Sequence, residues 1–170
     1  MVRLDRQSRY DLETARRKAR KIMSSFSFPD IDLSMPPGQR LRFLRDSMGL
    51  SNKELARRSG VSSTTITNAE KGRLTLRVPT AAKLARFLGI SPGFLLIDNG
   101  VSGKGELAEM LRNVRYMLGM TQAEFADIIG VNATSVRDWE LGERELTDRC
   151  RKLIQVVADE VLGYLQRGGY

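Results

Sequence analysis

Residues 51–72 read SNKELARRSGVSSTTITNAEKG, and residues 121–142 read TQAEFADIIGVNATSVRDWELG. The glutamates, glycines and apolar residues of the first segment return in the second at a constant offset, as in Gly60 and Gly130 (130 − 60 = 70). The same register extends upstream to Arg45 and Arg115 without a gap. A shared register of this length indicates two copies of one small fold.

Each copy carries local signals for two short helices joined by a tight turn. Ser51 and Thr121 both stand three residues before a glutamate, which is the pattern of a capping box at the start of a helix. The glycine at position 60 or 130 permits a sharp turn, and Ser62 then provides a side-chain cap for the next helix of the first copy. The spacing predicts a helix-turn-helix in each copy and an all-α chain.

The length of 170 residues allows two small domains with aliphatic cores, since 41% of the residues are hydrophobic and only 6% are aromatic. We expect four segments along the chain. They are an N-terminal basic helix and tether at 1–38, a first helix-turn-helix domain at 39–98, a Gly-rich linker at 99–105, and a second domain with a long C-terminal helix at 106–170.

Residue usage argues against an enzyme and against a cofactor. The chain has no histidine and a single cysteine, Cys150, so His-based acid–base chemistry and zinc sites made of His or of four cysteines are excluded. No Gly-rich phosphate loop is present, and no apolar run approaches the roughly 20 residues of a membrane-spanning helix. We therefore expect no metal, no cofactor and no membrane, and the lone cysteine fits a reducing cytoplasm.

The net charge of +8 is spread unevenly. Residues 1–38 carry 8 Lys/Arg against 5 Asp/Glu, residues 39–98 carry 11 against 4, and residues 99–170 carry 9 against 11. Because basic side chains attract nucleic-acid phosphates, the first copy is expected to supply most of any non-specific affinity for a polyanion.

Two helices are expected outside the repeated units. Residues 9–23 place one apolar stripe on an otherwise basic helix, which leaves open a packed surface helix, an arm along a DNA backbone or a dimer contact. Residues 148–165 carry a wide apolar stripe that either completes the second core or extends into a dimer seam.

The residues quoted above resemble the phage-repressor helix-turn-helix family (Cro-like, XRE). Gln122, the Gly130-Val131 turn, Val136 and the Glu140-x-Gly142 ending stand at family positions. The resemblance implies two lambda-repressor-like helix-turn-helix domains in tandem, and a second helix of each pair that enters the major groove of DNA.

The resemblance also implies roles for single residues. The base-reading positions are Ser63, Thr64, Thr67 and Asn68 in the first copy and Ala133, Thr134, Arg137 and Asp138 in the second. The phosphate-contact positions are Asn52, Lys71, Arg73, Arg77 and Gln122. Arg45 with Glu70, and Arg115 with Glu140, match a structural ion pair that joins the first helix to the end of the reading helix.

The expected function is a sequence-specific DNA-binding transcriptional regulator of phage or mobile-element type, bound to double-stranded DNA through one copy or both. The alternative is an antitoxin or another protein-binding module that represses its own promoter and binds a partner through its terminal segments. A homodimer would form through 148–165 or 9–23, and RNA polymerase, a toxin or an antirepressor are the protein partners considered.

Overall fold

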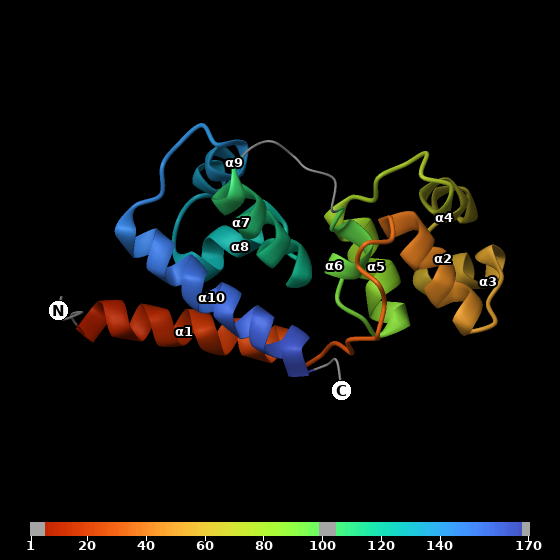
Figure 1. Ribbon diagram of the computed structural model, residues 1–170, viewed down its shortest axis with the longest axis horizontal. Coiled ribbons are helices and arrows are strands. Elements are labelled where there is room, and N and C mark those ends of the chain that lie inside the picture. Colours follow the sequence, from red (N-terminus) through yellow and green to blue (C-terminus); the bar gives the residue numbers. More distant parts are fainter. Residues whose placement is uncertain (1–5, 99–104, 168–170) are drawn as a thin grey trace.

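The structure is a computed structural model that describes residues 6–98 and 105–167, and these residues form helices and loops arranged in two lobes (Figure 1). Helices make up the secondary structure, apart from an isolated parallel bridge between Ser27 and Ile90. The expected all-α class is confirmed for this part of the chain. Except for Gly105, the predicted linker at 99–105 lies outside the described residues.

The first lobe is built from five consecutive helices. They are α2 (Pro37–Ser47), α3 (Asn52–Ser59), α4 (Ser63–Glu70), α5 (Val78–Leu88) and the single turn α6 (Gly93–Leu96). Local sequence explains several of these helix ends. Pro37 begins α2, where the first N–H groups of a helix have no acceptor within the helix, so a residue without an N–H is tolerated. Gly60 ends α3 in a left-handed conformation that favours glycine. Leu41, Leu55 and Ile66 meet in the core and are fully buried.

The second lobe repeats the first three helices and then departs from the pattern. It contains α7 (Glu106–Met117), α8 (Gln122–Ile129), α9 (Ala133–Leu141) and α10 (Asp148–Arg167). Gly89, in a left-handed conformation, and Pro92 separate α5 from α6. The residues 70 positions later are Asp159 and Leu162, neither of which interrupts a helix, so α10 continues through this region. One 20-residue helix therefore takes the place of the pair α5 and α6.

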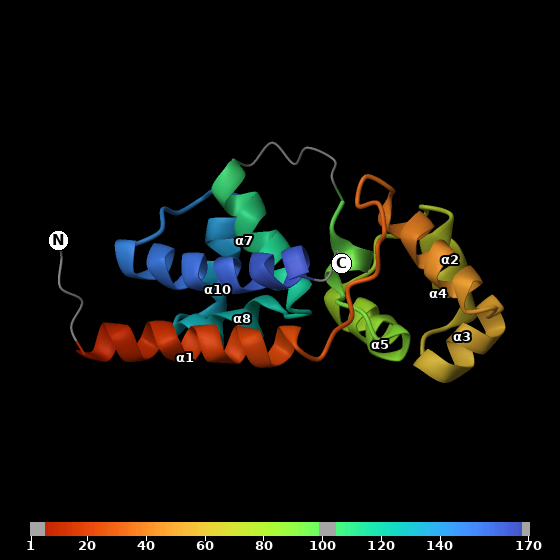
Figure 2. The same ribbon diagram turned by 60° about the horizontal axis from the view of Figure 1, so that its bottom comes forward.

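The N-terminal helix α1 (Arg6–Met23) packs on the second lobe, against α10 and α8, although the whole first lobe separates them in sequence (Figure 2). Ala15, Ala19 and Met23 recur every four residues and are fully buried. Two ion pairs flank this contact, from Arg149 to Asp11 at 3.0 Å and from Arg20 to Glu160 at 2.9 Å.

The order of these ion pairs along the chain shows that α1 and α10 run in the same direction, and α10 also packs on α7 and α8. The two stripes that the sequence left open between core and dimer contact are thus used inside one chain, with Val157 and Val161 of α10 also buried. The Glu160 carboxylate accepts hydrogen bonds from Arg20, which lowers its pKa below the ordinary value. The expected division of the chain into segments at 1–38, 39–98, 99–105 and 106–170 stays a prediction.

Direct contacts join the two lobes. The Ser91 hydroxyl donates to the Met117 carbonyl oxygen at 2.5 Å, and Gly93 lies so close that a Cβ there would approach the Met117 Sδ to 2.1 Å. From the segment after α1, the Phe28 ring lies 6.3 Å from Phe94 of the first lobe and 6.2 Å from Tyr164 of the second. The first lobe therefore packs on the second through α6 and α7.

A buried arginine holds α6 in place. The Arg40 side chain is fully buried and donates to three backbone carbonyls, those of Met35 at 2.7 Å, Phe94 at 2.8 Å and Ile97. Loss of hydration on burial lowers its pKa. The second lobe has Met110 at the matching position. It has no short helix corresponding to α6, because α10 is continuous there, and so it has no carbonyls for an arginine at this position to bind.

Candidate nucleic-acid interface

Capping boxes fix the start of the first helix in each helix pair. The Ser51 N–H donates to the Glu54 carboxylate at 2.8 Å, and the Glu54 N–H donates to the Ser51 hydroxyl at 3.2 Å. The same reciprocal bonds join Thr121 and Glu124 at 2.7 and 3.3 Å, so both predicted capping boxes are confirmed. The backbone bond from Ser51 lowers the pKa of Glu54.

The turn that follows sets the angle between the paired helices. Gly60 and Gly130 both adopt the left-handed conformation, with φ of +72° and +68°. A side chain is strained there, so glycine is required for the chain to leave α3 or α8 and enter the next helix at once. Ser62 and Asn132 then cap α4 and α9 by accepting from Thr65 and Ser135 backbone N–H groups.

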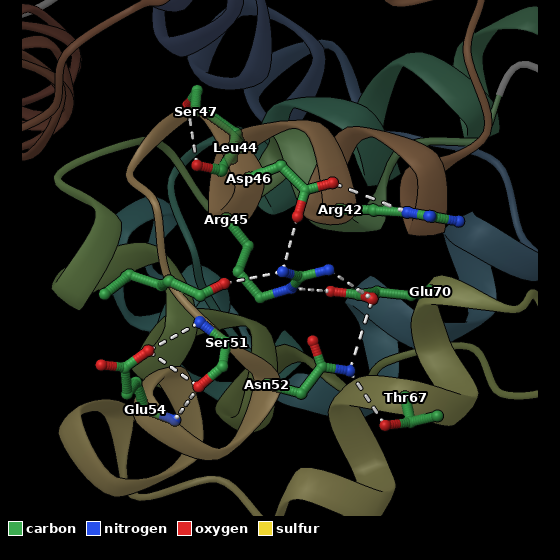
Figure 3. A network of polar contacts seen from close by, with 11 residues as sticks. Arg42, Leu44, Arg45, Asp46, Ser47, Ser51, Asn52, Glu54, Thr67 and Glu70 are labelled. Atoms are coloured by element: carbon green, nitrogen blue, oxygen red, sulfur yellow. Dashed lines mark hydrogen bonds and ion pairs between the residues drawn. The ribbon is translucent and has the colours of Figure 1, made fainter.

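A bidentate ion pair ties the first helix of each lobe to the end of the reading helix. Arg45 bonds Glu70 at 2.6 and 3.1 Å, and Arg115 bonds Glu140 at 2.6 and 2.9 Å (Figure 3 shows the first pair). The second pair is the more buried, with side chains 6% and 5% exposed. The Glu70 carboxylate raises the pKa of Arg45, which stays charged.

In the first lobe the reading helix α4 turns its apolar side inward and a polar side outward. Ile66 and Ala69 are buried, whereas Thr64 is exposed. The remaining predicted base readers, Ser63, Thr67 and Asn68, are partly exposed on the same short helix. This surface consists of hydroxyl and amide groups, which can pair with base edges in the major groove.

Cations follow α4 on an exposed loop. Lys71, Arg73 and Arg77 are all exposed, while Leu76 between them is buried and anchors the loop to the core. Among the described residues these three side chains form no ion pair. Free cations beside a polar helix face suit contact with phosphates.

The reading helix of the second lobe offers a different surface. Thr134 and Arg137 are exposed, but the Arg137 guanidinium pairs with its neighbour Asp138 at 3.0 Å. The loop after α9 carries Glu143 and Glu145, and the Glu145 carbonyl accepts a bond from the buried Trp139 indole at 3.3 Å. Trp139 thus fills the core. The positions that match Lys71, Arg73 and Arg77 hold Leu141, Glu143 and Thr147, and Arg144 lies between the two glutamates of this loop.

The two predicted phosphate ligands at the helix starts are held by protein groups. Gln122 Nε2 donates to Glu140 at 2.9 Å, and Asn52 Nδ2 donates to the Thr67 hydroxyl at 2.9 Å and lies 3.5 Å from Glu70 (Figure 3). Sequence reasoning missed the link between Asn52 and Thr67. The signal available was the replacement of the usual glutamine by the shorter asparagine at position 52.

A helix-turn-helix family model matches residues 41–95 and again residues 111–149, which together exceed half of the chain. The chain belongs to the XRE-type helix-turn-helix family. No curated protein and no solved structure matches it. The two matched segments carry the tandem copies that the 70-residue register predicted.

Membership of the XRE-type family identifies the chain as a DNA-binding regulator. In the XRE-type fold the second helix of the pair enters the major groove, which corresponds to α4 and α9 here. Over residues 6–98 and 105–167, every helix is too short or too polar to span a lipid bilayer.

Proposed function

We propose that this XRE-type protein is a sequence-specific transcriptional regulator of phage or mobile-element type, and that the first lobe provides its main grip on DNA. The observation that carries the proposal is the joint exposure of a polar reading helix and a cationic loop on one lobe. Thr64 and Asn68 read bases, and Lys71, Arg73 and Arg77 bind the flanking phosphates.

The second lobe adds specificity more than affinity. Its reading helix offers Thr134, and Arg137 once that side chain leaves Asp138, but the loop beyond it is acidic. An aspartate at this position can only accept hydrogen bonds, from cytosine N4 or adenine N6, and is repelled by nearby phosphates. Because the lobes are in contact through α6 and α7, binding by one restricts where the other can lie.

The positive charge of α1 does not contribute to this interface. Figure 1 shows α1 along the lower edge of the second lobe and α9 at its upper end, with α7 and α8 between them. Because α1 lies at the opposite edge of the second lobe from α9, we expect its exposed Arg17 and Lys21 to add little to the binding of DNA read by α9, whereas Lys18 lies closer, beside Gly130 in the turn before α9. This placement favours the packed surface helix over the DNA-backbone arm.

The antitoxin alternative has less support than the DNA-reading function. It assigns partner binding to the terminal segments, but the apolar faces of α1 and α10 cover each other. A partner or a second copy would have to bind the outer faces of these helices, where Leu162 is 51% exposed.

Selection of bound sequences from random DNA, followed by the double variant Thr64→Ala, Asn68→Ala, tests the proposed function. We expect the full chain to enrich one sequence, and the variant to lose most of the ratio between its affinities for that sequence and for scrambled DNA, while its affinity for scrambled DNA is kept. The control Ser51→Ala acts on helix capping, away from the bases, and should keep the ratio of the two affinities. An unchanged ratio in the double variant would contradict the assignment.

A further inference from the structure

Asn52 lies at the centre of a hydrogen-bond chain that joins α2, α3 and α4. Arg45 donates to Glu70, Asn52 Nδ2 lies 2.9 Å from the Thr67 hydroxyl, and it lies 3.5 Å from the other Glu70 oxygen (Figure 3). An ionised carboxylate only accepts hydrogen bonds, so the Asn52 side chain must turn its NH₂ group, not its oxygen, toward Glu70.

This orientation commits both N–H groups of Asn52 to protein partners. A side-chain amide has two donors, and here one is directed at Thr67 and the other at Glu70. The atom left over is Oδ1, an acceptor, which repels a phosphate oxygen. Gln122 differs, because its one partner among the described residues is Glu140, so one N–H remains for a phosphate.

The same orientation fixes the role of Thr67. Its oxygen accepts from Asn52, and its own O–H proton bonds to no group in the described part of the chain. Thr67 is partly exposed on the polar side of α4. A hydroxyl in this state is ready to donate outward, toward the acceptors of a base edge.

We propose that Asn52 is a positioning residue that presents Thr67 as a hydrogen-bond donor to a major-groove acceptor, namely guanine O6 or N7, adenine N7 or thymine O4. It replaces the phosphate contact usual at this position with control of base reading. Cytosine offers only its N4 donor in the major groove and is the base least suited to this threonine. The inference rests on the proposed entry of α4 into the major groove.

Two variants, measured against the selected DNA and scrambled DNA, separate positioning from phosphate contact. Thr67→Val removes the hydroxyl and keeps the shape, and Asn52→Ala removes the amide. Each should lower the ratio of cognate to scrambled affinity roughly five- to tenfold, the effect of one neutral hydrogen bond, with scrambled binding unchanged. Thr67→Ser, which keeps the hydroxyl, should restore most of the ratio.

A double variant and a matched control complete the test. Asn52→Ala combined with Thr67→Val should lose no more discrimination than Thr67→Val alone, because both act through one bond. Gln122→Ala, the matching change in the second lobe, should weaken cognate and scrambled binding equally. Circular dichroism of each variant verifies that it is folded.

Equal weakening of both DNAs by Asn52→Ala would mean a phosphate contact and would overturn the inference. Unchanged discrimination by Thr67→Val would overturn it as well, while leaving the proposed function in place. If the wild-type chain did not discriminate between the selected and the scrambled DNA, the proposed function itself would be wrong. That result differs from the two above, so failure of the inference and failure of the proposed function can be told apart.

Discussion

The packing of α1 on the second lobe predicts a large and localised effect for the substitution Met23→Ala. Met23 is fully buried at the end of the stripe that begins with Ala15 and Ala19. Removal of the side chain beyond Cβ loses its transfer free energy and leaves a cavity, and buried Met→Ala changes cost about 2–5 kcal/mol. Against a total of about 5–15 kcal/mol for a typical domain, this is a large fraction.

The sequence offers a matched control in Met48→Ala. Met48 is 48% exposed on the first lobe, so the same chemical change there should shift the free energy of unfolding by roughly 0.5 kcal/mol or less. The two variants therefore separate the loss of a packed α1 from any general effect of removing a methionine.

Urea unfolding and hydrogen exchange measure the size and the place of the effect. We expect Met23→Ala to lower the free energy of unfolding by at least about 2 kcal/mol and to speed exchange in α8 and α10 first. If the two methionine variants had equal effects, or if the faster exchange appeared in α3 and α4, α1 would not stabilise the second lobe as described.

Three further predictions concern the ion pairs and the lobe contact. Glu140→Gln removes one partner of a pair only about 5% exposed and should cost about 3–5 kcal/mol in urea unfolding; a loss below about 1 kcal/mol would contradict burial of the charge. Gly93→Ala places a methyl group 2.1 Å from the Met117 Sδ and should raise the radius of gyration in X-ray scattering, whereas Gly163→Ala meets only a flexible side-chain end at 3.6 Å and should not. The pKa of Glu160 is lowered in the folded chain, so its ion pair stabilises the fold above the unfolded pKa of about 4.5, and this contribution is lost as the pH falls through the folded value. Glu160→Gln should therefore make the melting temperature depend less on pH in the acid range. A pH profile identical to that of the wild type would exclude this role.

The parts of the fold that could be predicted from sequence are those specified by neighbouring residues. Capping boxes, turn glycines and apolar spacing act within a few positions, so the helix pairs could be located from 51–72 and 121–142 alone. The ion pairs followed from the family pattern, and the structure places Arg45 and Arg115 as that pattern implies.

The remaining features depend on contacts between distant segments. An apolar stripe reveals that a helix needs a partner but not which one, so the pairing of α1 with α10 could not be inferred. From the sequence, Arg40 looks like one more surface cation, but its side chain is buried and donates hydrogen bonds to the carbonyls of Phe94 and Ile97. The Asn52–Thr67 bond joins residues 15 positions apart and depends on the angle between two helices.

The salt dependence of DNA affinity tests most directly whether the first lobe provides the main contacts to DNA phosphates. Each phosphate neutralised contributes about 0.9 to the slope of log affinity against log salt. Replacing Lys71, Arg73 and Arg77 by glutamine should reduce that slope by roughly two to three, while the same replacement of the exposed Arg17 and Lys21 on α1 should change it little. Equal changes of slope in the two variants, or a larger change for the α1 variant, would contradict DNA binding through the first lobe.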